Sequence, residues 1–367
     1  MCQGLPLAAT DAPADGGTPC DTDFAVDTPP PPGLDELDLA SALERSWDLD
    51  AGQLHYVPKG FGSYHWLTGT SVNRNFLTVD DLSIKPWLGG SPDATFEGLE
   101  AAYDSALALH RQANLSFVVA PIPQLDGGTA LRLSERYALT VFPFIEGESG
   151  IWGDPIGRTD REQLLRQLAE LHRSTPVVAS RSLRHGTVLP GRTVLKHALD
   201  DLDRRWTGGP YSEPARRELA THATAVHEWM IAFDHLAGRV EQAGSEQVVT
   251  HGEPHPGNLM YTDHGVLFVD WDTVGLAPPE RDLWMFDDGS PDILAPYTEA
   301  SGRMIDDTAI SLFRLAWKLS DIAAFTALFR SDHGRNQGAE KSLRALTDSL
   351  EGALATRPYR PTPPAAT

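Results

Sequence analysis

The stretch from His251 to Asp272 constrains this 367-residue chain more than any other part of its sequence. It begins with a polar loop, His251 to Asn258, whose two glycines and two prolines keep it from forming a helix. Two apolar runs follow, Leu259 to Thr262 and Val266 to Val269, with turn residues between them. The pattern predicts an irregular loop that leads into a β-hairpin.

The hairpin is expected to bring an amide and a carboxylate together. If residues 263–265 form a three-residue turn, Thr262 lies opposite Val266, and Asn258 lies opposite Asp270. Opposed side chains on one face of such a ladder lie about 4.5 to 5.5 Å apart at Cβ, so both can bind one hard cation such as Mg²⁺. A two-residue shift of register would instead place Asn258 opposite Phe268 or Asp272. Asn258 and Asp270 are therefore the predicted metal ligands, and the prediction depends on the turn.

Glu253 is the predicted catalytic residue. It lies five residues before Asn258, in a loop that can aim its carboxylate at a ligand held by the metal. A general base beside two Mg²⁺ ligands is what phosphoryl transfer requires. The zinc-protease interpretation of His251 and His255 needs a helix, which the loop cannot form. A polar hairpin with a purely structural role is the alternative.

The rest of the chain predicts an α+β fold. Short apolar runs separated by glycines and turn residues predict strands over 54–58, 64–68 and 75–79, and helical spacing follows over 96–110. Two further apolar runs, 116–121 and 137–145, read as buried strands. From residue 151 onward helices dominate, including 212–238, 310–329 and 339–354, and most tryptophans at helical spacing are expected in the core.

Composition excludes several classes of partner. Thirty basic residues against 51 acidic ones give a formal charge of −21, which repels nucleic acids and anionic lipid surfaces. No apolar run is long enough to cross a membrane. Residues 1–14 lack a basic start and an apolar core, so we expect no secretory signal and a cytoplasmic location.

The motifs resemble the aminoglycoside phosphotransferase family, and among its branches the spectinomycin phosphotransferases. The matching stretches are 142–147, 251–258, 269–272 and 277–283. The resemblance implies a two-lobed, protein-kinase-like fold. It has a small nucleotide-binding N-terminal lobe over 34–143, with an antiparallel sheet and one helix, and a larger, mainly helical lobe over 144–355 that carries the catalytic and metal loops. Residues 1–33 and 356–367 are expected to be disordered tails, because they are rich in proline and poor in large apolar side chains.

The same resemblance assigns roles by position. Glu253 lies where the family has its catalytic Asp, Asn258 and Asp270 lie at the metal positions, and Asp282 matches a structural Asp that steadies the catalytic loop. The expected contacts to ATP or GTP are those of a glycine-rich loop and an interlobe hinge: Gly60, Gly62, Ser63, Phe142 and Phe144.

The third strand departs from the family pattern, since Thr78 stands near the position of the phosphate-binding lysine. Lys85, Lys59 or Arg74 is expected to supply that charge from another direction, and of these Lys85 is the predicted nucleotide-binding residue. Glu97 and Glu100 are candidates for the partner of such a lysine, although a solvated helix face explains them as well.

The expected function is transfer of the γ-phosphoryl group of ATP or GTP, with Mg²⁺, to a hydroxyl of a small cationic or sugar-containing molecule. Antibiotic inactivation is the leading role. The alternatives are a biosynthetic small-metabolite kinase and a pseudokinase-like binding protein that transfers no phosphate. The chain is expected to act as a monomer or homodimer.

Overall fold

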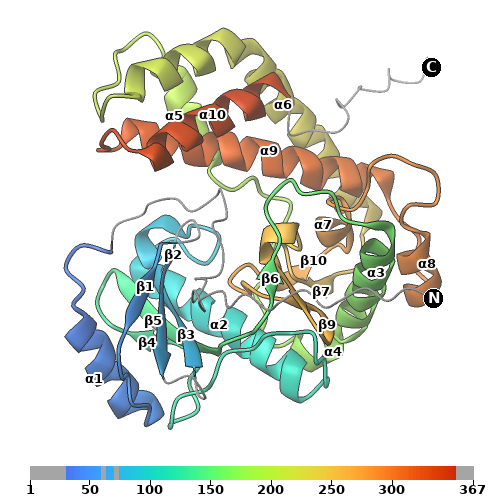
Figure 1. Ribbon diagram of the computed structural model, residues 1–367. Helices are drawn as coiled ribbons and strands as arrows, with labels where there is room; N and C mark the ends of the chain where they lie inside the picture. The colour runs from blue at the N-terminus through green and yellow to red at the C-terminus, as the bar shows by residue number, and fades with distance from the viewer. Residues whose placement is uncertain (1–29, 59–62, 70–73, 353–367) are drawn as a thin grey trace, which may run out of the picture.

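The computed structural model describes residues 30–58, 63–69 and 74–352. Most of the predicted tail over 1–33, the whole tail over 356–367, and Gly60 and Gly62 of the predicted nucleotide loop lie outside these residues. The described chain forms a small lobe around an antiparallel sheet and a larger, mainly helical lobe (Figure 1). This confirms the α+β, two-lobed fold expected from the sequence.

The small lobe is built on a five-stranded antiparallel sheet in the order β1-β2-β3-β5-β4. Its strands are β1 (His55–Val57), β2 (Ser63–Gly69), β3 (Arg74–Asp81), β4 (Leu131–Arg132) and β5 (Tyr137–Pro143). Side chains alternate between its two faces. Leu77 and Val79 pack under helix α1 (Glu36–Trp47), which Asp35 caps at its N-terminus. On the other face lies α2 (Pro92–Arg111), whose Tyr103 packs edge-on against Phe142.

The larger lobe consists mainly of helices around the catalytic segment. The helices are α3 (Arg158–Arg173), α4 (Thr175–Val178), α5 (Arg192–Asp200), α6 (Ser212–Ala243), α7 (Glu280–Leu283), α8 (Ala295–Ser301), α9 (Asp307–Arg330) and α10 (Gln337–Glu351). In Figure 1, α5, α6, α9 and α10 gather on one side of the lobe. No helix among the described residues is long and apolar enough to cross a membrane.

Helix α6 continues past its predicted end at Gly238. It runs to Ala243 and stops at Gly244, which has a left-handed φ of 64°. Gly238 lies in the interior of the helix sequence, and a Cβ there would meet no atom within 4 Å, so a side chain at this position would face open space. One interior glycine costs a helix only about 1 kcal/mol, and packing of α6 against α9 outweighs that cost.

A hairpin is formed by β8 (Leu259–Thr262) and β9 (Gly265–Phe268), and it is here called the catalytic hairpin because it follows the predicted catalytic residue. Two extended segments of the chain form backbone hydrogen bonds with it. The chain leaving β5 forms β6 (Glu148–Ser149), which pairs with β8. The predicted strand over 116–121 does not join the small-lobe sheet. Instead, the Phe268 N–H donates to the Phe117 oxygen, and the Val119 N–H donates to the Phe268 oxygen.

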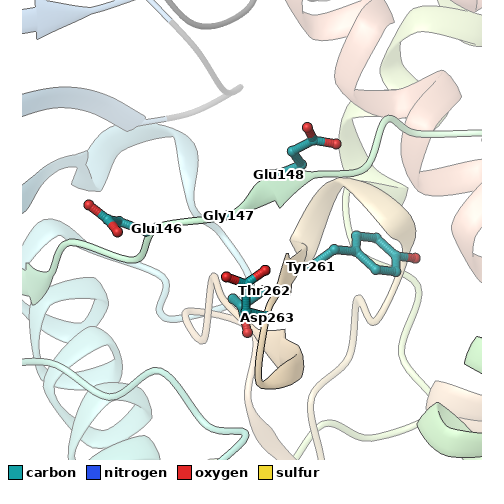
Figure 2. Close-up of a pocket in the computed structure, with 6 residues that line it drawn as sticks. All are labelled: Glu146, Gly147, Glu148, Tyr261, Thr262 and Asp263. Carbon is teal, nitrogen blue, oxygen red and sulfur yellow. The ribbon is translucent and has the colours of Figure 1, made fainter.

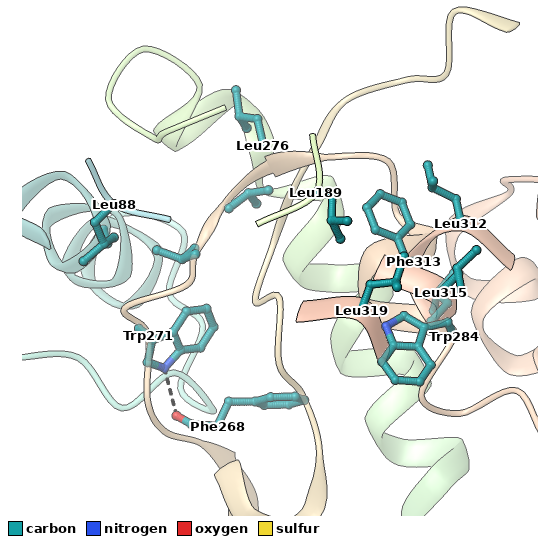
Figure 3. Close-up of a cluster of buried hydrophobic side chains, with 14 of the residues drawn as sticks. Leu88, Leu189, Phe268, Trp271, Leu276, Trp284, Leu312, Phe313, Leu315 and Leu319 are labelled. Carbon is teal, nitrogen blue, oxygen red and sulfur yellow. Dashed lines mark hydrogen bonds between the residues drawn. The ribbon is translucent and has the colours of Figure 1, made fainter. Parts of the chain in front are cut away.

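The segment after β9 is anchored in the core by Trp271. Its indole is fully buried, and its Nε1 donates to the Phe268 oxygen at 2.9 Å (Figure 3). The same apolar cluster includes Trp284 and residues of α9 such as Phe313 and Leu319. Burial of this one side chain fixes the position of the two aspartates that flank it.

Candidate active site

The catalytic hairpin has a two-residue turn, so its predicted register is wrong by one residue. Thr262 pairs with Gly265 and Leu259 with Phe268, which leaves only Asp263 and His264 in the turn. Gly265 has a φ of 115° and serves as the first residue of β9 rather than the last residue of the turn. The Val269 N–H donates to the Asn258 oxygen at 3.0 Å, so Val269 rather than Asp270 continues the ladder opposite Asn258.

Asp270 reaches the site by a different route from the one predicted. Its φ of 64° turns the chain out of the ladder immediately after β9. Asp270 and Asp272 both influence the charge state of Glu253 and of Lys85. The structure therefore gathers Glu253, Asp270, Asp272 and Lys85 into one electrostatic cluster, although the hairpin geometry that predicted it was incorrect.

A buried carboxylate holds the catalytic loop in place. Asp282, on α7, accepts the backbone N–H of His251 at 2.9 Å and of Gly252 at 2.6 Å. The buried His172 side chain lies 3.0 Å from the same carboxylate and 2.8 Å from the Tyr297 hydroxyl. This is the steadying role that the family resemblance implied for Asp282.

Two further contacts shape the start of the loop. Gly252 has a φ of 99°, and a Cβ there would lie 2.5 Å from the Arg281 guanidinium. The His251 Nε2 donates to the Val269 oxygen at 2.9 Å, and its Nδ1 accepts the Glu253 N–H at 3.3 Å. Histidine must be neutral to donate and accept in this way. These contacts fix the backbone conformation of the loop up to Glu253.

The side chain of Glu253 is buried among other acidic side chains. Burial, followed by the charges of Asp272 and Asp270, raises the pKa of Glu253 to about 8. Nearby, Asn258 uses its amide Nδ2 to donate to the Glu253 backbone oxygen at 3.0 Å. That hydrogen bond orients the Asn258 amide and leaves its oxygen free to act as a ligand to a hard cation.

Lys85 enters the site from the turn after β3. It is only 2% exposed, and its Nζ lies 2.5 Å from Asp272 Oδ2 and 3.0 Å from Asp80 Oδ1. The negative charges of Asp272, Asp80 and Asp270 outweigh its burial and raise the pKa of Lys85. Lys85 therefore stays charged and connects the small lobe to the segment after β9.

The two carboxylate partners of Lys85, Asp80 and Asp272, were not predicted from the sequence. Asp80 also accepts the Ser63 hydroxyl at 2.7 Å and the Tyr103 hydroxyl at 3.1 Å, so it links the predicted nucleotide-loop serine to Lys85. The signal for Asp80 was its place two residues after Thr78, on the same face of β3. Thr78 is buried next to His65, and neither Glu97 nor Glu100 forms an ion pair with Lys85.

Phe142 and Phe144 lie at the start of the interlobe linker, on either side of Pro143 at the end of β5. The Phe142 ring packs against Tyr103. The Arg74 guanidinium lies 3.8 Å from the centre of the Phe144 ring, and the Phe144 N–H donates to the Arg74 oxygen. These contacts hold both rings against the small lobe.

A cavity of about 400 Å³ lies where the linker crosses the β8–β9 turn (Figure 2). Its lining is Glu146, Gly147, Glu148, Tyr261, Thr262 and Asp263. None of the predicted catalytic, metal or nucleotide residues lines it. We therefore assign the chemistry to the cluster around Glu253 and not to this cavity.

Known proteins resemble this chain in sequence and in fold. The model of a family described as the phosphotransferase enzyme family matches residues 73–308. Protein StrN of Streptomyces griseus is 26% identical over 279 residues, which span 70% of this chain and 78% of StrN.

Solved structures share the fold. Spectinomycin phosphotransferase in complex with ADP and spectinomycin has a TM-score of 0.67 at 17% identity, over 87% of this chain and 98% of that one. Amicoumacin kinase in complex with AMP-PNP and Ca²⁺ has a TM-score of 0.54 at 12% identity, over 89% and 96%. A microcompartment-associated aminopropanol kinase has a TM-score of 0.54 at 17% identity, over 88% and 98%.

Proposed function

Since this chain belongs to the phosphotransferase enzyme family, we propose that it transfers the γ-phosphoryl group of ATP to a hydroxyl group of a small molecule. The observation that carries the proposal is the cluster of Glu253, Asn258, Asp270 and Lys85 on a backbone-fixed loop. A reaction that consumes ATP belongs in the cytoplasm, where we propose that it takes place.

Glu253 is the proposed catalytic residue. Its carboxylate would accept a hydrogen bond from the acceptor hydroxyl, orient that oxygen and take its proton during transfer. The side chain of Glu is one carbon longer than that of the family's Asp, and the contacts of Asp282 fix the backbone from which it extends. The acceptor hydroxyl would therefore lie farther from this loop than in enzymes with Asp.

The residues present fit a Mg²⁺ ion held together with phosphates. Asn258 and Asp270 offer hard oxygen donors, and Asp270 makes no hydrogen bond or ion pair among the described residues. No group of three acidic, His or Cys side chains forms a metal site by itself in the described part of the chain. Mg²⁺ is typically bound by one or two carboxylates plus substrate phosphates. When bound, it would neutralise negative charge on the phosphates.

The nucleotide site is proposed between the lobes. Gly60, Gly62 and Ser63 would cover the phosphates, with Lys85 as the nearest buried cation, and the linker at Phe142 and Phe144 would meet the base. GTP is the alternative donor. ADP and AMP-PNP occur with the spectinomycin and amicoumacin kinases, and this supports an adenine nucleotide here.

Antibiotic inactivation is the proposed biological role. The fold is shared with kinases named for spectinomycin and amicoumacin. A small-metabolite kinase is the second candidate, which the likeness to an aminopropanol kinase favours.

The test is ADP production from ATP and Mg²⁺ with a panel of spectinomycin, aminoglycosides, amicoumacin and 1-amino-2-propanol. We expect Glu253→Gln to lower kcat by about 10² to 10⁴ while ADP affinity changes little. The matched control is Glu228→Gln, at an exposed position on α6. A Glu253→Gln variant with undiminished turnover would contradict the catalytic role, and a protein that binds nucleotide but phosphorylates nothing would support the pseudokinase alternative.

A further inference from the structure

Arg281, on α7, lies among acidic side chains but forms hydrogen bonds with neutral atoms. Its Nη1 donates to the Thr250 hydroxyl at 2.8 Å, and its Nη2 donates to the Thr273 backbone oxygen at 3.0 Å. No ion pair joins Arg281 to an acid in the described part of the chain, whereas Arg314 on α9 pairs with Asp287 at 2.8 Å. Arg281 therefore uses its donors to join two segments of the chain.

The two segments that Arg281 joins are those that carry the candidate site. Thr250 is the last residue of β7 (Val248–Thr250) and lies three residues before Glu253. Thr273 lies three residues after Asp270, a predicted metal ligand. A single guanidinium group thus connects the start of the catalytic loop with the segment after β9.

Two hydroxyl groups complete this connection. The Thr250 hydroxyl donates to the Gly275 oxygen at 2.8 Å, and the Thr273 hydroxyl donates to the His251 oxygen at 2.8 Å. Each hydroxyl therefore crosses from one segment to the other. Because the guanidinium of Arg281 is planar and presents its N–H donors in fixed directions, it holds both segments in one geometry.

The guanidinium also lies directly against the backbone that precedes Glu253. A Cβ at Gly252 would lie 2.5 Å from Nη2 of Arg281. The next residue of α7, Asp282, accepts the N–H groups of His251 and Gly252. The positive charge of Arg281 acts on Glu253 as well, since it opposes the rise in the pKa of Glu253 that burial, the largest cause, produces. Neighbouring residues of α7 therefore fix the loop immediately before the catalytic carboxylate.

The same two segments are joined again at their far ends. There the Val269 N–H donates to the Asn258 oxygen, and the ladder of β8 and β9 continues the pairing. The hairpin therefore holds Asn258 and Asp270 together without help from Arg281. We expect loss of the guanidinium to loosen the chain around Glu253 and to leave the predicted metal ligands in place.

We propose that Arg281 is a positioning residue that fixes Glu253 relative to Asp270 and so sets the rate of phosphoryl transfer. The proposal rests on the proposed function. Misplacement of a catalytic group by about 1 Å costs an enzyme about 10² in rate. The effect of Arg281 is indirect, because its donors are bonded to Thr250 and Thr273.

Hydrogen exchange tests the hold on the loop without any need for activity. Full-length wild-type protein and Arg281→Ala are exchanged in D₂O, and mass spectrometry compares peptides over 249–255 and 259–268. In Arg281→Ala we expect exchange of the loop peptide to become about tenfold faster and that of the hairpin peptide to change by less than about twofold, because the opening is local. Arg217→Ala, at an exposed position on α6, is the matched control and should alter neither peptide.

Guanidinium chloride, at concentrations far below those that unfold proteins, should reverse the change in Arg281→Ala. Sodium chloride at the same ionic strength should not. Arg281 is partly exposed, so a free guanidinium ion can reach the position that the substitution leaves open.

Turnover tests the consequence for the reaction. ADP production from ATP and Mg²⁺ is followed with the compound of the panel above that is turned over fastest. We expect kcat of Arg281→Ala to fall by about 10² while KM for ATP changes by less than about threefold, and we expect guanidinium to restore part of kcat. Arg281→Lys keeps the charge but lacks the planar fork, so it should still lose about tenfold in kcat, and it carries both tests if Arg281→Ala does not fold.

An unchanged loop peptide in the variants, or an equal rise in both peptides, would overturn the proposal whether or not the protein is a kinase. A loosened loop with an unchanged kcat would overturn it as well. A loosened loop in a protein whose wild type phosphorylates no compound of the panel supports the hold of Arg281 on the loop and contradicts the proposed function alone.

Discussion

Replacing Lys85 with methionine tests the buried ion-pair cluster most directly. At an effective dielectric constant of about 20, two charges 3.0 Å apart attract by roughly 5 kcal/mol. The cost of removing each charge from water offsets much of this attraction. The larger effect comes from breaking the cluster, because Lys85→Met leaves two buried carboxylates without their cation. Such a change typically costs about 3 to 5 kcal/mol, and we expect that loss here.

The structure also predicts which carboxylate causes the loss. Asp80 retains the hydroxyls of Ser63 and Tyr103 after the substitution, whereas Lys85 supplies the hydrogen bond that Asp272 accepts. Adding Asp272→Asn to Lys85→Met should therefore recover about 1 to 3 kcal/mol, and adding Asp80→Asn should recover less.

The assay is urea unfolding in the presence of EDTA, followed by circular dichroism. Lys196→Met, at an exposed position on α5, is the control and should stay within about 0.5 kcal/mol of wild type. If Lys85→Met matches this control, or if Asp80→Asn rescues it better than Asp272→Asn does, the reasoning is refuted.

Three further predictions concern the catalytic loop. Asp282→Asn replaces a carboxylate oxygen that accepts the His251 and Gly252 N–H groups with an amide group that is itself a donor. We expect the free energy of unfolding in urea to fall by about 2 to 3 kcal/mol. We also expect kcat to fall by more than KM changes. Gly252→Ala should destabilise the protein by more than about 1 kcal/mol, because the backbone at Gly252 is left-handed and a Cβ there would meet Arg281. Gly238→Ala on α6 should stabilise it by about 0.5 to 1 kcal/mol, because a Cβ there meets no atom. Thermal melts should show a lower Tm for the first variant and a higher Tm for the second. Burial lowers the pKa of His251 from 6.5 to about 4, so the unfolded chain binds a proton that the native state refuses, and stability should fall from pH 6.5 towards pH 4 by about 1.4 kcal/mol per unit for this residue. His251→Gln should make the pH dependence of the unfolding free energy, measured by urea unfolding, shallower by that amount, and an unchanged slope would contradict a neutral His251.

The grouping of Glu253, Asn258 and Asp270 could be predicted from the sequence because the three residues are close together in the chain. Glu253, Asn258 and Asp270 lie within 18 residues, and their order around a hairpin restricts their function whatever the exact register. The turn length could not be predicted, because Gly265 suits either the last position of a three-residue turn or the first position of a strand. The error moved Asp270 out of the ladder without moving it out of the site.

The contacts of Lys85 and of Trp317 could not be predicted for a different reason. Lys85 and Asp272 are 187 residues apart, and no local pattern records such a pairing. On α9, helical spacing is the same for a tryptophan that fills the core and for one that is half-buried against another element. Only the three-dimensional structure shows that Trp317 stacks on Trp152.

The pairing of β6 with β8 limits how the two lobes swing. Beyond Gly147 the linker is part of the same ladder as the catalytic hairpin, so rotation of the small lobe must be absorbed by the few residues after Pro143. Arg74 spans this short pivot, stacking on Phe144 and pairing with Glu146, whose side chain is 84% exposed. Rotation of the small lobe would therefore break the exposed contacts of Arg74 and leave the pairing of β6 with β8 intact. Under the proposed function, release of the nucleotide would depend on the strength of the Arg74 contacts, while Glu253 and Asp270 keep their positions.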